Sequence, residues 1–125
     1  MISVTLGILE ERPERDRCEL GAQVNHAFRL IRNKKPCPET VERFGGGWVG
    51  DEALVISLYC ALASKGNFAA GVRLAVNHSG DSDSTGSITW NILGALLGKG
   101  AIPNAWLAKL ELAEVIEETA LQFLE

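Results

Sequence analysis

The residues best suited to chemistry lie in one short polar stretch, residues 77–86, which reads Asn-His-Ser-Gly-Asp-Ser-Asp-Ser-Thr-Gly. Asp81 and Asp83 stand two positions apart, and hydroxyl side chains lie between and after them. Carboxylates and hydroxyls are hard oxygen donors, which favour Mg²⁺, Mn²⁺ or Ca²⁺ over zinc or copper. An apolar helix is predicted to begin near Ser84, and its first turn leaves free N–H groups that suit a phosphate or carboxylate.

Three interpretations of this stretch compete on pattern alone. A calcium-binding EF-hand loop needs a bidentate Glu at its twelfth position, where this chain has Ile92, so that interpretation fails. The phosphoryl-transfer loop of haloacid-dehalogenase-like enzymes follows a buried strand, whereas residues 77–80 here are polar or small, so that interpretation is weak. The third is a polar loop in which an Asp or Ser caps the next helix, and it suits an isolated cluster of this composition best.

Several segments around this stretch resemble one known family. Residues 75–88, followed by residues 93–98 and the Ile102-Pro103 pair, are similar to the carboxy-terminal metal motif of the ADP-ribosylglycohydrolase family. Upstream, residues 47–54 and 58–62 resemble the helix that precedes this motif in bacterial members. Because several motifs occur in the family's order and spacing, the resemblance is specific.

The resemblance implies an all-α enzyme with two Mg²⁺ or Mn²⁺ ions, which cleaves the bond joining ADP-ribose to a protein side chain or small acceptor. It places Asp81, Asp83 and Ser84 at the ligand positions of the second metal motif, with Ser84 where Thr is common. The family's other ligands come from an amino-terminal region with a Gly-Asp motif and a Thr-Asp-Asp-Thr-like cluster, neither of which occurs in these 125 residues. We therefore expect a carboxy-terminal portion that holds Mg²⁺ or Mn²⁺ weakly, because three donors are too few for an octahedral ion.

Two classes of function follow from this expectation. The first is a Mg²⁺-dependent ADP-ribosylglycohydrolase-like hydrolase whose remaining ligands come from another chain or from a longer product. The second is a non-catalytic remnant or interaction module, dimeric through an unmatched helix face, that at most binds an ADP-ribose-type ligand weakly. The sequence names no catalytic residue. His78 precedes the motif and suits a base or ligand, but a histidine at a helix end more often makes a structural hydrogen bond.

Composition predicts a single helical domain over residues 1–125, because 46% hydrophobic and 22% charged residues are ordinary for a globular chain of this length. A net charge of −4 and a pI near 5.2 disfavour nucleic acid or an anionic membrane as the main partner. The three cysteines are widely spaced and match no zinc or redox pattern. Without a secretory signal or an apolar run near 18 residues, we expect a soluble cytoplasmic protein with reduced thiols.

Hydrophobic periodicity predicts a compact all-α fold of about six helices, resembling the carboxy-terminal part of the family fold. Residues 2–8 alternate as a strand would, but the run is short and contains Gly7. Asp51 is the expected cap of a nearly all-apolar helix reaching Lys65. The other expected segments are 16–33, 38–44, 68–76, 84–97, 103–110 and an amphipathic closing helix over 112–124 with an acidic, solvated face.

Two features of these elements carry open alternatives. Gly45-Gly46-Gly47 is either a loop that lets backbone approach a ligand or, slightly favoured, a helix C-cap and connector. Trp90 interrupts a face of small residues formed by Gly86, Gly94 and Gly98. We hypothesise that Trp90 covers apolar surface that amino-terminal helices of the family would bury, and the alternative is that Trp90 points to a substrate.

Overall fold

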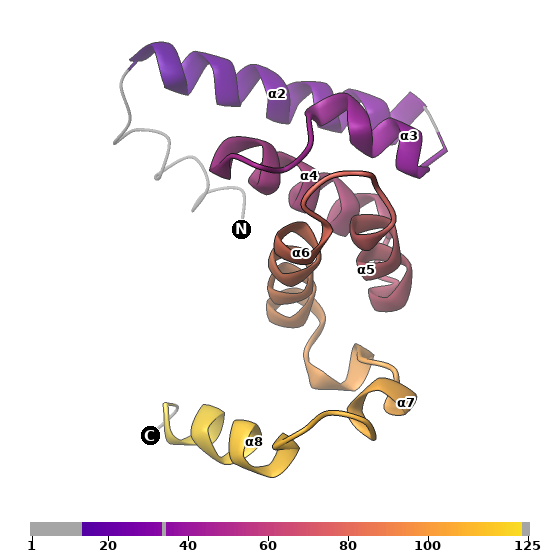
Figure 1. Ribbon diagram of the computed structural model, residues 1–125, viewed down its shortest axis with the longest axis vertical. Coiled ribbons are helices and arrows are strands. Elements are labelled where there is room, and N and C mark those ends of the chain that lie inside the picture. The colour runs from indigo at the N-terminus through magenta and orange to yellow at the C-terminus, as the bar shows by residue number, and fades with distance from the viewer. Residues whose placement is uncertain (1–13, 34, 124–125) are drawn as a thin grey trace.

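The computed structural model describes residues 14–33 and 35–123. Every helix or strand that it contains in this range is a helix, which confirms the all-α prediction, whereas the alternating residues 2–8 lie outside it. Figure 1 shows these helices in chain order. They are α2 (Glu14–Asn33), α3 (Pro38–Val41), η1 (Glu42–Phe44), α4 (Gly50–Ala63), α5 (Phe68–Val76), α6 (Ser82–Leu97), η2 (Lys99–Ala101), α7 (Asn104–Leu107) and α8 (Ala113–Gln122).

Helix α2 lies across α4 and contributes one apolar stripe to the larger hydrophobic core (Figure 1). Leu20, Ala27 and Leu30 of α2 are buried, and their spacing of seven and three keeps them on one helical face. Phe44 closes the same core from η1 and packs its ring against Tyr59 of α4, with centroids 5.1 Å apart. The predicted amphipathic helix over residues 16–33 is therefore confirmed, with its apolar side turned to α4.

Helix α4 is central, because it packs against α2 and also against α5 and α6. Its sequence is apolar almost all round, which suits a helix surrounded by neighbours. The buried Ser57 hydroxyl lies 2.7 Å from the Ala53 carbonyl oxygen and 3.1 Å from that of Thr85. Thr89 donates to the same Thr85 oxygen at 2.7 Å, so the polar groups between α4 and α6 are satisfied inside the core.

Trp90 belongs to a second, smaller core between α5 and α6. Its indole packs edge-on to Phe68, with ring centroids 4.8 Å apart, and stacks on Trp106 of α7 at 5.6 Å. The side chain is thus partly buried by aromatic partners at the far end of α5 from the polar stretch. Whether it also covers surface that other helices would bury stays a hypothesis.

Helix α8 projects from the body of the protein (Figure 1). Lys99 and Glu117 form an ion pair between the segment after α6 and α8. The apolar side chains of α8 lie open to solvent; Phe123 is 86% exposed. The amphipathic helix expected over 112–124 therefore forms, but in the part of the chain that the structure describes it does not close over the core.

The predicted cap of α4 was wrong. Val49, in extended conformation, occupies the N-cap position, and the helix begins at Gly50, so Asp51 lies in its first turn. Glu52 instead accepts a hydrogen bond from the Gly47 N–H at 3.0 Å, which uses the first turn of α4 to hold the glycine segment. The acidic pair still lies at the positive end of the helix dipole, as expected for its composition.

Among the described residues, no helix combines the length and the apolar character that spanning a membrane requires.

Two glycines test the close packing of α5 and α6. A β-carbon at Gly71 would lie 2.7 Å from Leu93 Cδ1 and 3.3 Å from the Cys60 carbonyl oxygen, whereas one at Gly94 would meet open space. We expect Gly71→Ala to lower the free energy of unfolding by about 1–3 kcal/mol through overpacking. Gly94→Ala should raise it by roughly 0.5–1 kcal/mol, because alanine suits a helix better. Urea denaturation of both variants measures the difference, and equal effects would contradict this packing.

Candidate metal site

The polar stretch begins where α5 ends and is folded back against the glycine segment. Asn77, the C-cap of α5, donates from its side chain to the Arg73 carbonyl at 2.6 Å. The Asp81 N–H then donates to the Gly46 carbonyl at 2.7 Å, and a β-carbon at Gly80 would overlap that same carbonyl. Two glycine backbones therefore meet in a space that admits no side chain.

The glycine segment combines both roles that its sequence suggested. Gly45 is the C-cap of η1 with a φ of +105°, and Gly47 has a φ of +78°, a region that favours glycine. The connector interpretation is thus confirmed. Gly46 adds a close backbone approach, although what it approaches is the polar stretch of the same chain. Because Gly47 is also bonded to Glu52, the polar stretch is held in register with the start of α4.

His78 is buried beneath this loop, with 8% of its surface exposed. Its Nδ1 accepts a hydrogen bond from the Gly80 N–H at 3.1 Å, which assigns the ring proton to Nε2. Nε2 then donates to the Thr85 hydroxyl at 2.9 Å, and Thr85 can donate in turn to the carbonyls of Ala75 (2.9 Å) or Asp81 (3.0 Å). Both ring nitrogens of His78 are therefore engaged, and the structural interpretation of this histidine is confirmed.

Asp81 is the N-cap of α6, which therefore begins at Ser82 and not near Ser84 as predicted. Its Oδ1 accepts a hydrogen bond from the Ser84 N–H at 3.4 Å. A hydrogen bond with the Asp83 carboxyl group, together with those from Ser84, holds the pKa of Asp81 below its ordinary value, and the nearby charge of His78 acts in the same direction. The capping role expected of an isolated cluster is thus real, and it leaves Oδ2 of Asp81 outside the cap.

The structure brings all three predicted ligands together at the start of α6. Asp83 and Ser84 lie exposed in the first turn, beside the capping Asp81. Within the described residues, no group of three or more His, Cys, Asp and Glu side chains could hold a metal ion. The donor set is therefore two carboxylates and one hydroxyl. Its all-oxygen chemistry fits Mg²⁺ or Mn²⁺, but as a partial set, since an octahedral ion takes six ligands.

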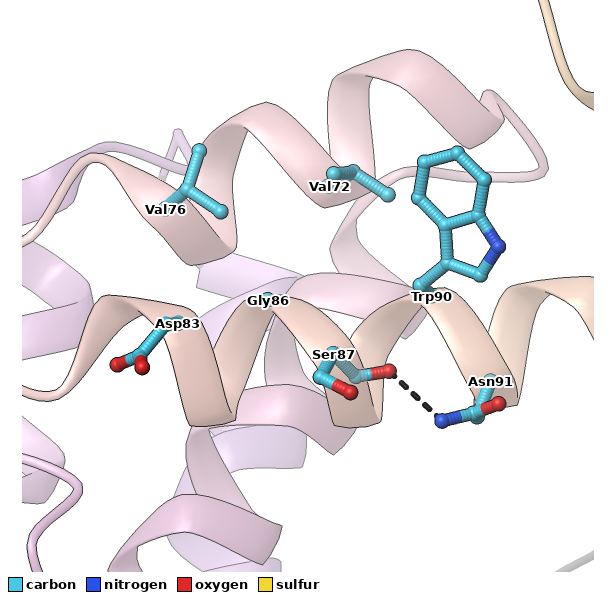
Figure 2. Close-up of a pocket in the computed structure, with 7 residues that line it drawn as sticks. All are labelled: Val72, Val76, Asp83, Gly86, Ser87, Trp90 and Asn91. Carbon is cyan, nitrogen blue, oxygen red and sulfur yellow. Dashed lines mark hydrogen bonds between the residues drawn. The ribbon is translucent and has the colours of Figure 1, made fainter. Parts of the chain in front are cut away.

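A shallow groove runs from this cluster along the crossing of α5 and α6, with a volume of about 400 Å³ (Figure 2). Asp83 lies at one end and Trp90 at the other. Sequence reasoning missed the groove, although residues 83, 87, 90 and 91 share the helical spacing of one face. Its lining residues are Val72, Val76, Asp83, Gly86, Ser87, Trp90 and Asn91.

Fold and site together define a helical protein with an oxygen-donor cluster at a helix N-terminus. The chain belongs to the ADP-ribosylglycohydrolase family, whose family model matches residues 2–125. It is 35% identical over 75 residues to the ADP-ribosylhydrolase ARH1 of Dictyostelium discoideum. That similarity covers 60% of this chain and 19% of the relative, so the matched part spans about a fifth of that protein. No solved structure gives a significant match.

The lowered pKa of Asp81 gives a test of the cap. A carboxyl group whose pKa is depressed on folding stabilises the native state above its unfolded pKa, near 3.8, and that contribution is lost as the pH falls through the folded value. We expect Asp81→Asn, which keeps a good capping side chain, to be less stable than the wild type at pH 7 in metal-free buffer. The gap should close as the pH approaches 3. A gap that stays constant in urea denaturation from pH 7 to 3 would contradict this assignment.

Proposed function

We propose that this chain supplies part of the metal-dependent active site of an ADP-ribosylglycohydrolase-like hydrolase. The reaction is hydrolysis of the glycosidic bond between ADP-ribose and an acceptor. The observation that carries the proposal is the gathering of Asp81, Asp83 and Ser84 at the solvent-accessible start of α6. Membership of the family supports the same reaction class.

In this proposal, Asp81 and Asp83 hold Mg²⁺ or Mn²⁺ through carboxylate oxygens, and Ser84 adds a neutral oxygen. The ion would supply positive charge to orient ribose hydroxyls and to activate water. The protein's own contribution is positioning. Asp81 is oriented by its hydrogen bond from the Ser84 N–H, and the buried His78 holds the preceding loop through Gly80. The free N–H groups of the first turn of α6 favour an anionic or hydroxyl-rich ligand.

The remaining ligands come, we propose, from another chain or from a longer product that contains these residues. The argument is one of number, because two carboxylates and a hydroxyl fill only part of an octahedral shell. Alone, the chain should hold the ion weakly and hydrolyse little. The free thiols of Cys37 and Cys60 support a reducing compartment such as the cytoplasm.

A second function, a non-catalytic interaction module, is favoured by one observation. Helix α8 exposes an apolar face to solvent, and exposed apolar surface of this kind often marks an association site. The partner would be a second copy of the chain or the complementing chain. The side chains of α8 that carry this argument are Leu112, Val115, Ile116 and Phe123.

Thermal unfolding with and without ligand tests the hydrolase proposal. Mg²⁺ and ADP-ribose at about a hundred times the dissociation constant should stabilise the wild type by roughly 2.7 kcal/mol, which is a rise of several degrees in Tm. Asp83→Ala should abolish this shift, because it removes one of the two carboxylates.

Glu114→Ala is the matched control, since it removes an exposed acidic side chain on α8, remote in sequence from the cluster. It should retain the full shift. A wild type whose Tm does not respond to the ligands would contradict the proposed function and leave the loop as a helix cap.

A further inference from the structure

The groove between α5 and α6 is open because the helices cross on a glycine. A β-carbon at Gly86 would lie 2.6 Å from Val76 Cγ1, so the crossing is close at this point and no side chain rises from the floor. Val72 and Val76 form one wall from α5 (Figure 2). The groove's volume of about 400 Å³ lies within the range of small-molecule sites.

Trp90 closes the end of the groove with a ring whose orientation is fixed. Its centroid lies 4.8 Å from that of Phe68 and 5.6 Å from that of Trp106, and those two partners are themselves only 6.4 Å apart. Phe68 and Trp106 therefore cannot lie on opposite faces of the indole. Since Trp106 takes one face and Phe68 meets the ring near its edge, the second face is left for the groove.

The rim of the groove carries hydrogen-bonding groups with defined roles. Asn91 donates from Nδ2 to the Ser87 carbonyl at 3.0 Å, so its carboxamide oxygen Oδ1 remains as an acceptor (Figure 2). The Ser87 hydroxyl makes no hydrogen bond within the described residues. No basic side chain lines the groove. A ligand would therefore be held here by a flat ring with an N–H donor, and not by a phosphate.

The groove and the candidate metal site lie on one face of α6. Trp90 follows Asp83 by seven residues, which is nearly two helical turns and about 10 Å along the axis. A ligand with a ring at Trp90 would thus run along α6 towards Asp83. This separation suits a nucleotide that reaches both points.

We propose that this groove is an adenine subsite. The adenine ring stacks on the open face of Trp90 and donates from its exocyclic amino group to Asn91 Oδ1, while the sugar and diphosphate extend towards Asp83. The inference rests on the proposed function for the choice of ADP-ribose as the whole ligand. Recognition of the base itself needs neither metal nor hydrolysis.

Nuclear magnetic resonance of the full 125-residue chain tests the subsite, because each of its three tryptophans gives its own indole N–H signal. In metal-free buffer, adenosine should shift the Trp90 signal in a saturable way and leave that of Trp48, which is 74% exposed elsewhere, unchanged. Trp90→Leu should raise the Kd for adenosine about tenfold, and Trp48→Leu should not change it. Equal effects of the two substitutions, or no saturable shift at Trp90, would overturn the proposal.

A second variant avoids any risk to the aromatic core. Asn91 is exposed, and Asn91→Ala removes only the proposed acceptor. The wild type should bind adenosine several-fold more tightly than inosine, which lacks the amino donor, and Asn91→Ala should bind the two equally. Asn104→Ala, at an exposed asparagine of α7, should keep the wild-type preference. A wild type that does not discriminate between adenosine and inosine would overturn the proposed base contact.

Adding ADP-ribose with Mg²⁺ separates this inference from the proposed function. Mg²⁺ should tighten ADP-ribose binding in the wild type but not in Asp83→Ala, and it should leave adenosine binding unchanged in both. Adenosine binding at Trp90 without any gain from Mg²⁺ would support the subsite and contradict the metal site. A gain from Mg²⁺ without a ligand-induced shift at Trp90 would support the metal site and overturn the subsite.

Discussion

The candidate site depends on the backbone contact between Gly46 and the Gly80-Asp81 pair. The Asp81 N–H donates to the Gly46 carbonyl at 2.7 Å, and a side chain on Gly80 would occupy the space of that carbonyl. Through Gly47 and Glu52 the contact is tied to the first turn of α4. The position of Asp81, and with it the start of α6, is therefore set by backbone atoms that lie 35 residues away in the sequence.

A second set of buried hydrogen bonds fixes α6 against the rest of the fold. The Thr85 hydroxyl joins His78 to the end of α5, and the Thr85 carbonyl receives hydroxyls from α4 and from Thr89. Unsatisfied polar groups are costly inside a core, so these bonds favour one alignment of the helix. Because the carboxylate cluster and the α5–α6 groove both lie on α6, that alignment sets the distance between them.

The sequence predicted those features that depend on local spacing. Helical periodicity located the helices, and the close spacing of Asp81, Asp83 and Ser84 was enough to place them in one turn. Local spacing does not decide between neighbouring caps, which is why α6 begins at Asp81 and α4 at Val49. The Gly46 contact, the open face of the indole and the uncovered face of α8 depend on partners distant in sequence. No single-chain pattern specifies such partners.

The central claim, that these residues form a partial metal site, is tested most directly by counting water on a bound ion. Electron paramagnetic resonance of Mn²⁺ bound to the 125-residue chain, in water enriched in ¹⁷O, reports how many coordination positions are held by water. Three protein oxygens on an octahedral ion leave about three waters, and Asp83→Ala should add one. A fully hydrated ion would show that the cluster does not bind metal, and an ion with one water or none would show a ligand set that this account does not contain.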